Sequence, residues 1–550
     1  MLIPHSSRLR GACQLAVGAG LAIALTPISS FSAKAQPAVL ASPAAGDRIL
    51  LVLPFDNRTG QPSLEWVREA APEILGSRFA SAGFAPMSRP DRLYALDHLG
   101  LPEGFQPSRA SSLKLAQTLD ADSIIVGSYV TDGTGIVAEA QVVDVAHLRM
   151  SQPVTSRGEM RNLIAVFDSL AWSLTRQLDP GFSVAEETFV AAGAGLRLDA
   201  FEQYIRGITE QDQQERVRHL SQAVQLNPEF GQAWMALGRE EFAGQRYEQA
   251  ATAFAKVGRN GADILEAGFD RGLALMFSGD YLHAEEAFAG VARVLPLAPV
   301  LNNQGVSLAR RGKDGAPLFR QAMAADPSDA DYHFNLAVSL KRQGSAAEAL
   351  AELAQCLRLR PGDTEAQALL KAWKSPASAD SPAAPGEEAG AKVDPLERIV
   401  RTFDAVAFRQ AAQMLDQVDD SRLAALPPLE RARKLAGQAR DYLDRGLLLE
   451  AERLFLSAEA ADSSVAGAHA GLAEVRERTG DAEAARKEAH AALKLEPSAD
   501  AYLVLGRLDL AGGRLEEASK EAGEALKLAP QSRAALDLRR QIEAGGAQKR

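Results

Sequence analysis

Residues 234–254 open on Trp234-Met235-Ala236-Leu237-Gly238, and Ala250 and Phe254 follow on the same stretch. The same residue types return about 34 positions later, as Gly272, Ala284 and Phe288. A third glycine at position 305 continues the series. Self-similarity at a period between 20 and 50 residues is the signature of a repeat architecture rather than of one globular core. We therefore expect a stack of similar helical units.

The pattern W-x2-L-G followed by A-x3-F resembles the tetratricopeptide repeat, a pair of antiparallel helices about 34 residues long. The resemblance implies that positions 8 and 20 of each unit are small because two helices cross there. Larger residues at positions 4, 7 and 24 then fill the space between units. Prolines at 296, 327 and 361 stand where second helices would end. We place a first array at residues 198–373, with a degenerate opening unit at 200–228.

A break separates this array from a second one. Residues 374–395 hold 15 Pro, Ala, Gly or Ser in 22 positions, a composition typical of a flexible linker. Residues 396–431 are predicted to be helical, although they do not match the repeat. Regular units resume with Gly446, Gly480 and Gly513. The second array is placed at 396–545, and the helix expected at 531–544 would shield its last unit from water.

The chain before the repeats predicts a small α/β domain at residues 47–180. Apolar runs at 48–54 and 124–127 and an alternating run at 136–143 are typical of strands. A strand at 150–159 could pair with them. Helical spacing covers 63–82, 113–119 and 163–178. The fold class is therefore a small N-terminal α/β domain followed by a mainly all-α tetratricopeptide superhelix in two arrays.

This α/β region resembles the N-terminal domain of the TolB family. The resemblance rests on Val52-Leu53-Pro54-Phe55-Asp56-Asn57, on residues 115–128 and on Ala140-Gln141-Val142-Val143-Asp144. It implies a role in binding or assembly. TolB's own function does not transfer, because the chain carries no propeller-blade repeats.

The N-terminus predicts an export signal at residues 1–35. Arg8 and Arg10 precede an apolar stretch at 11–28, and Ala33-Lys34-Ala35 is a cleavage sequence. We expect cleavage after Ala35 and a periplasmic or secreted protein. The alternative is that the segment stays as a membrane anchor, since its length approaches that of a membrane span.

Composition and motifs exclude several functions. The chain has 71 Asp and Glu against 60 Lys and Arg, which argues against non-specific nucleic-acid binding. Its eight histidines form no H-x-x-x-H or H-E-x-x-H pair, and two cysteines cannot make a thiolate zinc cluster. We therefore expect no metal site, no cofactor and no catalytic residues.

The resemblance to tetratricopeptide repeats implies that first helices line a concave groove and that positions 2, 5, 6, 9, 12 and 13 face it. Position 6 is Asn303 in one unit and Asn335 in the next. An asparagine amide has a donor and an acceptor, so such a pair could bind a peptide backbone. Neighbouring groove positions would favour a carboxylate or an acidic segment; they hold Asn302, Arg310, Lys341 and Arg342. The alternative is that the amides bridge locally and the cations are solvated.

An apolar patch precedes these positions. It consists of Met235, Phe242, Phe269 and Met276, with Phe277 beside them. Methionine and phenylalanine on a groove can form an adaptable partner site. Packing in the core between repeats explains them equally well. The corresponding groove positions of the second array carry both acidic and basic residues, and this mixture does not indicate a particular kind of partner.

The sequence therefore predicts an exported, non-catalytic adaptor in envelope assembly or maintenance. Its partners would be other proteins or peptide segments held on the concave repeat surfaces, with membrane contact only through an uncleaved N-terminus. Two alternatives remain: an envelope enzyme that uses the α/β domain, and the sensory portion of a regulatory system.

Overall fold

The computed structural model describes residues 48–102, 108–258, 264–374, 395–404, 414, 418 and 421–548 of the 550-residue chain. The predicted export signal lies outside the described residues, as do residues 375–394 of the predicted linker. Within the described part of the chain, no helix combines the length and the apolar character needed to cross a membrane.

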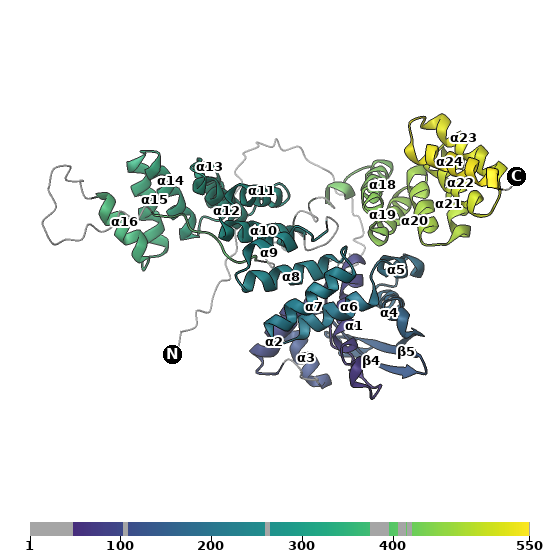
Figure 1. The fold of residues 1–550 in the computed structure, drawn as a ribbon, viewed down its shortest axis with the longest axis horizontal. Helices are drawn as coiled ribbons and strands as arrows, with labels where there is room; N and C mark the ends of the chain where they lie inside the picture. Colours follow the sequence, from purple (N-terminus) through teal and green to yellow (C-terminus); the bar gives the residue numbers. More distant parts are fainter. Residues whose placement is uncertain are drawn as a thin grey trace, which may run out of the picture. The chain divides into compact units, whose positions relative to one another are not determined.

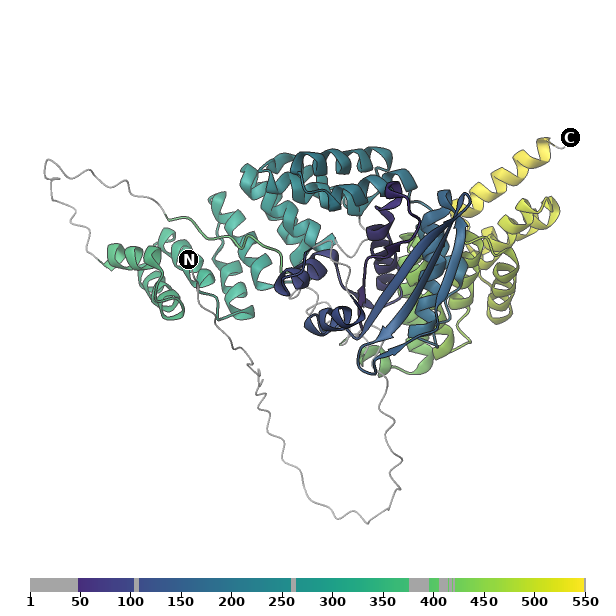
Figure 2. The ribbon, with the colours of Figure 1, turned by 90° about the horizontal axis from the view of Figure 1, so that it is seen from below.

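The first described region is built on one mixed sheet, whose long strands are seen in Figure 2. The strand order is β3-β1-β4-β5-β6, with β2 paired to β4 and β7 paired to β5. Strand β1 pairs in parallel with β3 and with β4, whereas β5 pairs antiparallel with β4 and with β7. The strands are β1 Ile49–Val52, β2 Asp56–Asn57, β3 Ala85–Pro86, β4 Ser123–Asp132, β5 Gly135–Asp144, β6 Arg149–Met150 and β7 Val154–Glu159.

Helices cover both faces of this sheet. Leu50 and Val52 of β1 pack in one core with α1 (Val67–Ser81) and α4 (Leu163–Leu178). Leu51 and Leu53 enter a second core with α2 (Arg89–His98) and α3 (Arg109–Thr118). A strand buried on both faces has a continuous apolar run rather than an alternating one, which explains the sequence of β1. The predicted α/β class is confirmed, although α2 and β3 were not predicted.

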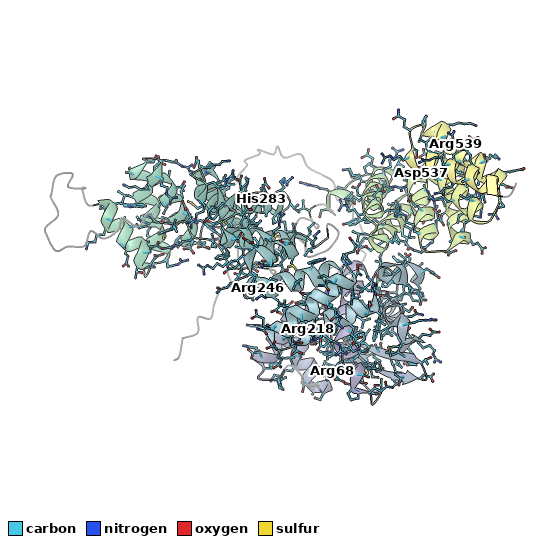
Figure 3. All side chains as sticks on the ribbon, viewed as in Figure 1. Arg68, Arg218, Arg246, His283, Asp537 and Arg539 are labelled. Atoms are coloured by element: carbon cyan, nitrogen blue, oxygen red, sulfur yellow. The ribbon has the colours of Figure 1, made fainter. Side chains whose placement is uncertain are left out.

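A long helical region follows (Figure 1). Its first part comprises α5 Glu186–Gly193, α6 Leu198–Thr209, α7 Gln213–Leu226, α8 Gly231–Ala243, α9 Tyr247–Phe254, α10 Ile264–Ser278, α11 Tyr281–Ala292, α12 Ala298–Arg310, α13 Ala316–Ala325, α14 Ala330–Arg342, α15 Ala346–Leu359 and α16 Thr364–Lys374. Consecutive helices pair along the chain, as the repeat period predicts. Charged side chains such as Arg218, Arg246 and His283 lie exposed on this region (Figure 3).

The packing of these pairs explains the period in the sequence. A Cβ added to Gly238 would come within 2.6 Å of the Phe254 ring, and one on Gly272 within 2.6 Å of the Phe288 ring. No side chain fits under an aromatic ring at that distance. The glycine at position 8 and the phenylalanine at position 24 are therefore one packing unit, repeated from helix pair to helix pair.

The second part comprises α18 Pro428–Asp444, α19 Leu448–Ala461, α20 Ala466–Arg478, α21 Ala482–Leu495, α22 Ala499–Ala511, α23 Leu515–Leu528 and α24 Arg533–Gln548. Its cores are dominated by alanine, with Ala485, Ala489 and Ala492 fully buried. Gly480 takes φ +88° in the turn before α21, a left-handed conformation that favours glycine. The spaced glycines of this array mark turns between helices, not helix crossings.

A buried carboxylate joins α19 to the beginning of the helical region. Glu452 of α19 is fully buried and accepts hydrogen bonds from the backbone N–H of Ala185 at 3.1 Å and from the Thr188 hydroxyl. The Arg476 guanidinium completes its partners at 2.5 Å. A buried charge is stable only when it is paired and hydrogen-bonded, so this contact is specific.

Candidate peptide-binding groove

Three asparagine side chains lie on neighbouring first helices of the first array. Asn302 and Asn303 belong to α12 and Asn335 to α14, and all three are fully buried. Burial of a primary amide is costly unless its donors and acceptor are satisfied. Their hydrogen-bond partners therefore show what the groove is built to hold.

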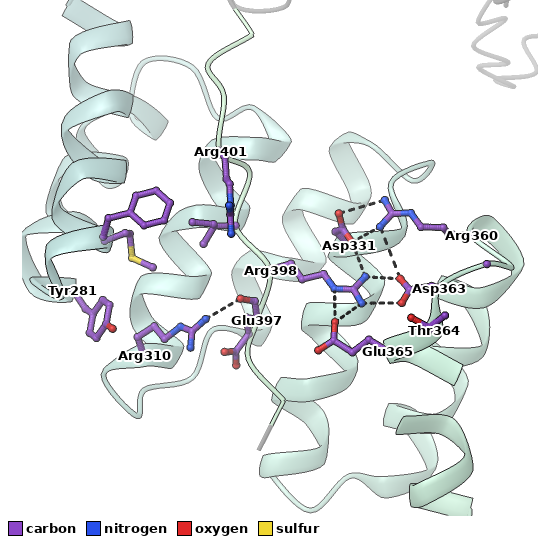
Figure 4. A pocket seen from close by; sticks show the side chains of 14 residues that line it. Tyr281, Arg310, Asp331, Arg360, Asp363, Thr364, Glu365, Glu397, Arg398 and Arg401 are labelled. Carbon is purple, nitrogen blue, oxygen red and sulfur yellow. Dashed lines mark hydrogen bonds and ion pairs between the residues drawn. The ribbon is translucent and has the colours of Figure 1, made fainter. Parts of the chain in front are cut away.

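The partners lie on a remote segment of the same chain. Residues 395–404 run without regular secondary structure along the groove (Figure 4). The prediction that residues 396–431 form a helix is wrong for this segment. Backbone groups that a helix would pair internally are taken here by groove side chains, and the β-branched pair Ile399-Val400 favours extended backbone.

Two asparagines each hold both backbone polar groups of one residue. The Arg398 N–H donates to Asn335 Oδ1 at 2.6 Å, and Asn335 Nδ2 donates to the Arg398 carbonyl at 2.7 Å. The Val400 N–H donates to Asn303 Oδ1 at 2.9 Å, and Asn303 Nδ2 donates to the Val400 carbonyl at 2.8 Å. The two asparagines thus bind every second residue of an extended chain through groups common to all amino acids.

Asn302 connects the two rungs. Its Nδ2 donates to the Arg398 carbonyl at 3.0 Å and to Asn303 Oδ1 at 3.2 Å. Its Oδ1 accepts from Asn335 Nδ2 at 2.7 Å. The three amides therefore orient one another around the segment.

Two arginines hold the N-terminal end of the segment. Arg342 of α14 donates to the Pro395 carbonyl at 2.7 Å and pairs with the Glu397 carboxylate. Arg310 of α12 donates to the Glu397 carbonyl at 3.0 Å. The Glu397 side chain is fully buried, so the pair with Arg342 is shielded from solvent. Both arginines thus bind backbone carbonyls, and Arg342 also binds the carboxylate.

Arg398 enters an acidic pocket on α14 and the start of α16 (Figure 4). Its guanidinium donates two bonds to Asp363, at 2.5 and 2.9 Å, one to Asp331 at 2.8 Å and two to Glu365, at 2.7 and 3.3 Å. It also lies over the Phe334 ring, 3.6 Å from the ring centre. A planar cation with several fixed donors suits this geometry, whereas an ammonium could not make the two-pronged contact.

The pKa shifts of Arg398 and Asp363 both favour the charged forms that make the ion pair. Burial alone would lower the pKa of Arg398, but the hydrogen bonds that it donates to Asp363, Asp331 and Glu365 outweigh burial and raise that pKa. The hydrogen bond from Arg398 also lowers the pKa of Asp363 below its ordinary value, against the opposing effect of burial. The pair is therefore fully ionised near neutral pH.

Apolar side chains complete the contact. Ile399 and Phe403 pack against the core formed by α10–α15, and Val400 packs on Leu301 and its neighbours. The Phe403 ring lies 5.7 Å from the Phe269 ring, and Arg401 lies over Phe277. The segment is therefore held by its side chains as well as by its backbone.

The structure brings five of the six predicted polar residues together around this segment: Asn302, Asn303, Arg310, Asn335 and Arg342. Lys341 lies apart from them, over the Trp373 ring at 5.5 Å.

The predicted apolar residues are dispersed. Met235 is 2% exposed and Phe269 is fully buried, both inside cores between helices. Phe242 packs edge-on against Tyr247, and Met276 lines the cleft beside the segment. In the second array, the mixed charges pair with one another, Arg440 with Glu474 and Arg507 with Glu477.

Sequence reasoning missed the acidic pocket. Asp331 stands at position 2 of its unit, one of the groove-facing positions, so its charge was a usable signal. Asp363 and Glu365 lie at the start of α16, where no repeat motif marks them. The prediction that the groove prefers an acidic segment therefore describes only the Glu397 end.

A further acid stands where the next asparagine of the series would be. Asp270 of α10 occupies position 6 of the preceding unit. Burial and, to a lesser extent, repulsion from Glu266 raise its pKa to about 7, although the nearby Arg239 lowers it. The described residues contain no group of three or more side chains that could hold a metal ion.

Comparison with known proteins supports the repeats. A family model for the tetratricopeptide repeat matches residues 217–263, 309–364 and 472–533. The chain therefore carries tetratricopeptide repeats in both helical parts. No curated protein matches the sequence. The resemblance of residues 47–180 to the TolB N-terminal domain stays a prediction.

Three solved structures illustrate the similarity found. YrrB, described as a TPR protein with an unusual peptide-binding site, is 16% identical over 37% of this chain and 99% of its own, with a TM-score of 0.28. The first TPR domain of human RPAP3 is 25% identical over 22% of this chain and 97% of its own, with a TM-score of 0.21. The C-terminal domain of LpoB from Salmonella enterica is 18% identical over 21% of this chain and 84% of its own, with a TM-score of 0.19.

Proposed function

We propose that this protein is an exported, non-catalytic scaffold that holds an extended segment of a partner protein in the groove of its first repeat array. Tetratricopeptide repeats support a protein–protein interaction scaffold in general. The groove supplies the specific element, since it presents amides, cations and an acidic pocket to one extended chain.

The observation that carries this proposal is the pair of two-pronged asparagine contacts. Asn335 and Asn303 bind the N–H and carbonyl of Arg398 and Val400 without using their side chains. Recognition through main-chain groups gives affinity for any extended segment, and side-chain pockets then give specificity.

Export and a role in envelope assembly or maintenance complete the proposal. They rest on the N-terminal sequence with its Arg8, Arg10 and Ala33-Lys34-Ala35 features. The TolB-like resemblance of residues 47–180 supports the same assignment, since it implies binding or assembly rather than chemistry.

Site-specific photocrosslinking tests the proposal. Tyr281 lines the cleft beside the segment, so a photoreactive analogue of tyrosine there reports what enters the groove. We expect intermolecular crosslinks in envelope fractions of the source cell, and we expect them to be lost with Asn303→Ala plus Asn335→Ala. Gln321→Ala, an exposed change on α13, is the matched control and should leave them unchanged.

Crosslinks that persist in the double asparagine variant would refute the groove as the binding site. A reproducible absence of intermolecular crosslinks from the unsubstituted groove would refute the scaffold proposal for this array.

A further inference from the structure

The groove of the first array is occupied in this structure by the chain's own residues 395–401. Twenty residues, 375–394, connect the end of α16 to the segment. A short connection of this kind produces an effective concentration on the order of millimolar. Any partner must therefore compete with a ligand that is always present.

The acidic pocket shows which partner can compete. Three carboxylates, those of Asp331, Asp363 and Glu365, surround the Arg398 guanidinium. Arg360 is the other cation there, 2.7 Å from Asp331 and 3.9 Å from Asp363. Removal of Arg398 leaves three negative charges against one positive charge, so an empty pocket attracts a cation strongly.

The pocket also distinguishes arginine from lysine. The two bonds to Asp363 need two parallel N–H donors, and the face of Phe334 needs a planar group above it. Arginine provides both and lysine provides neither. The neighbouring Arg342 adds a preference for an acid at the position before this arginine.

We infer that the groove's partner is an extended segment with an arginine at the register of Arg398, and that residues 395–401 are a tethered competitor for it. This inference rests on the proposed peptide-binding function. It adds to that function the residue type that the groove selects and the identity of the segment that occupies the groove in this structure.

Open space beside the segment gives a partner an advantage. A cleft of about 790 Å³ runs along it, lined on one side by Tyr281 and on the other by Thr364 and Glu365 (Figure 4), and Phe277 also lines it. The chain's own segment leaves this volume unfilled. A partner with larger side chains around its arginine can bury them there and offset the benefit of the tether.

Fluorescence anisotropy with a synthetic peptide tests the inference. The labelled probe has the sequence of residues 395–404, Pro-Leu-Glu-Arg-Ile-Val-Arg-Thr-Phe-Asp. It is titrated with the full chain, with Arg398→Ala, which weakens the tethered competitor, and with Leu396→Ala. Leu396 is 56% exposed in the same segment, so it is the matched control.

The probe should bind Arg398→Ala at least about 10-fold more tightly than the unsubstituted chain, since a competitor at about millimolar effective concentration masks a site of about micromolar affinity by about 1,000-fold. Leu396→Ala should behave as the unsubstituted chain. A probe with alanine in place of its first arginine should bind Arg398→Ala at least about 10-fold more weakly, and a probe with lysine there should lie between.

Other results overturn separate parts of the inference. If the probe binds the unsubstituted chain and Arg398→Ala with equal affinity, residues 395–401 are not a tethered competitor. If the arginine and alanine probes bind Arg398→Ala with equal affinity, the pocket does not select arginine. If no chain binds any probe, the proposed peptide-binding function itself fails. If light scattering finds a dimer that Arg398→Ala dissociates, the segment comes from a second copy and the tether is wrong.

Discussion

Asn303 offers a direct way to measure how strongly the groove holds an extended backbone. Its Oδ1 accepts from the Val400 N–H at 2.9 Å, and its Nδ2 donates to the Val400 carbonyl at 2.8 Å. Asn303→Ala removes both bonds and leaves the rest of the segment's contacts in place. At about 1 kcal/mol for each hydrogen bond, the segment should lose about 2 kcal/mol of stabilisation at this residue.

Hydrogen exchange at the Val400 amide reports this loss. Because 1.4 kcal/mol corresponds to a factor of ten, we expect the amide to exchange about 30-fold faster in Asn303→Ala than in the unsubstituted chain. Gln321→Ala, which is exposed on the neighbouring helix α13, should leave this exchange rate unchanged. Unaltered protection of Val400 in Asn303→Ala would refute the assignment of the asparagines as the groove's backbone contacts.

Three further changes test the packing and the charges of the arrays. Gly272→Ala should lower the free energy of unfolding by about 1–3 kcal/mol, since its Cβ would lie 2.6 Å from the Phe288 ring, and a denaturation curve with unchanged midpoint would contradict this. Burial is the main reason why the pKa of Asp270 rises from 3.8 to about 7, so the folded state favours the neutral acid. The free energy of unfolding should therefore fall as pH rises from about 4 to about 7. Asp270→Asn should flatten this pH dependence in urea unfolding. The hydrogen bond that His469 donates to Glu488 raises the pKa of His469. The stabilisation from this pair is therefore complete below about pH 6.5 and is lost as pH rises through the folded-state pKa, and Glu488→Gln should remove this dependence from thermal unfolding of the second array.

The repeats could be predicted from sequence because their packing is local. Gly238 and Phe254 lie in adjacent helices of one unit, and the same contact recurs in each unit, so one motif repeated in register defines the fold. The strand β1 could be recognised from its continuous apolar run, although its partners β3 and β4 lie far along the chain. Helix α2 was missed, since its first turn is Arg89-Pro90-Asp91-Arg92 and its apolar spacing is weak.

The groove could be predicted only in part. Asn303 and Asn335 stand at position 6, so their orientation followed from the repeat alone. Their partner could not be predicted, because Val400 lies 97 residues from Asn303 and the contact crosses the linker region. The β-branched pair Ile399-Val400 is the local signal for extended backbone, and it is too short to exclude a helix, so the amides that the segment meets select the extended form.

Trypsin cleavage after Arg398 tests the central claim most directly. Trypsin must bind that arginine in its own pocket, which is impossible while the guanidinium is held by Asp331, Asp363 and Glu365. In the native, unsubstituted chain, we predict cleavage of the Arg398–Ile399 bond at least about 100-fold slower than in the free peptide of residues 395–404, as expected for a millimolar tethered ligand of a micromolar site. Cleavage at the rate of the free peptide would contradict the claim that this groove holds the extended segment.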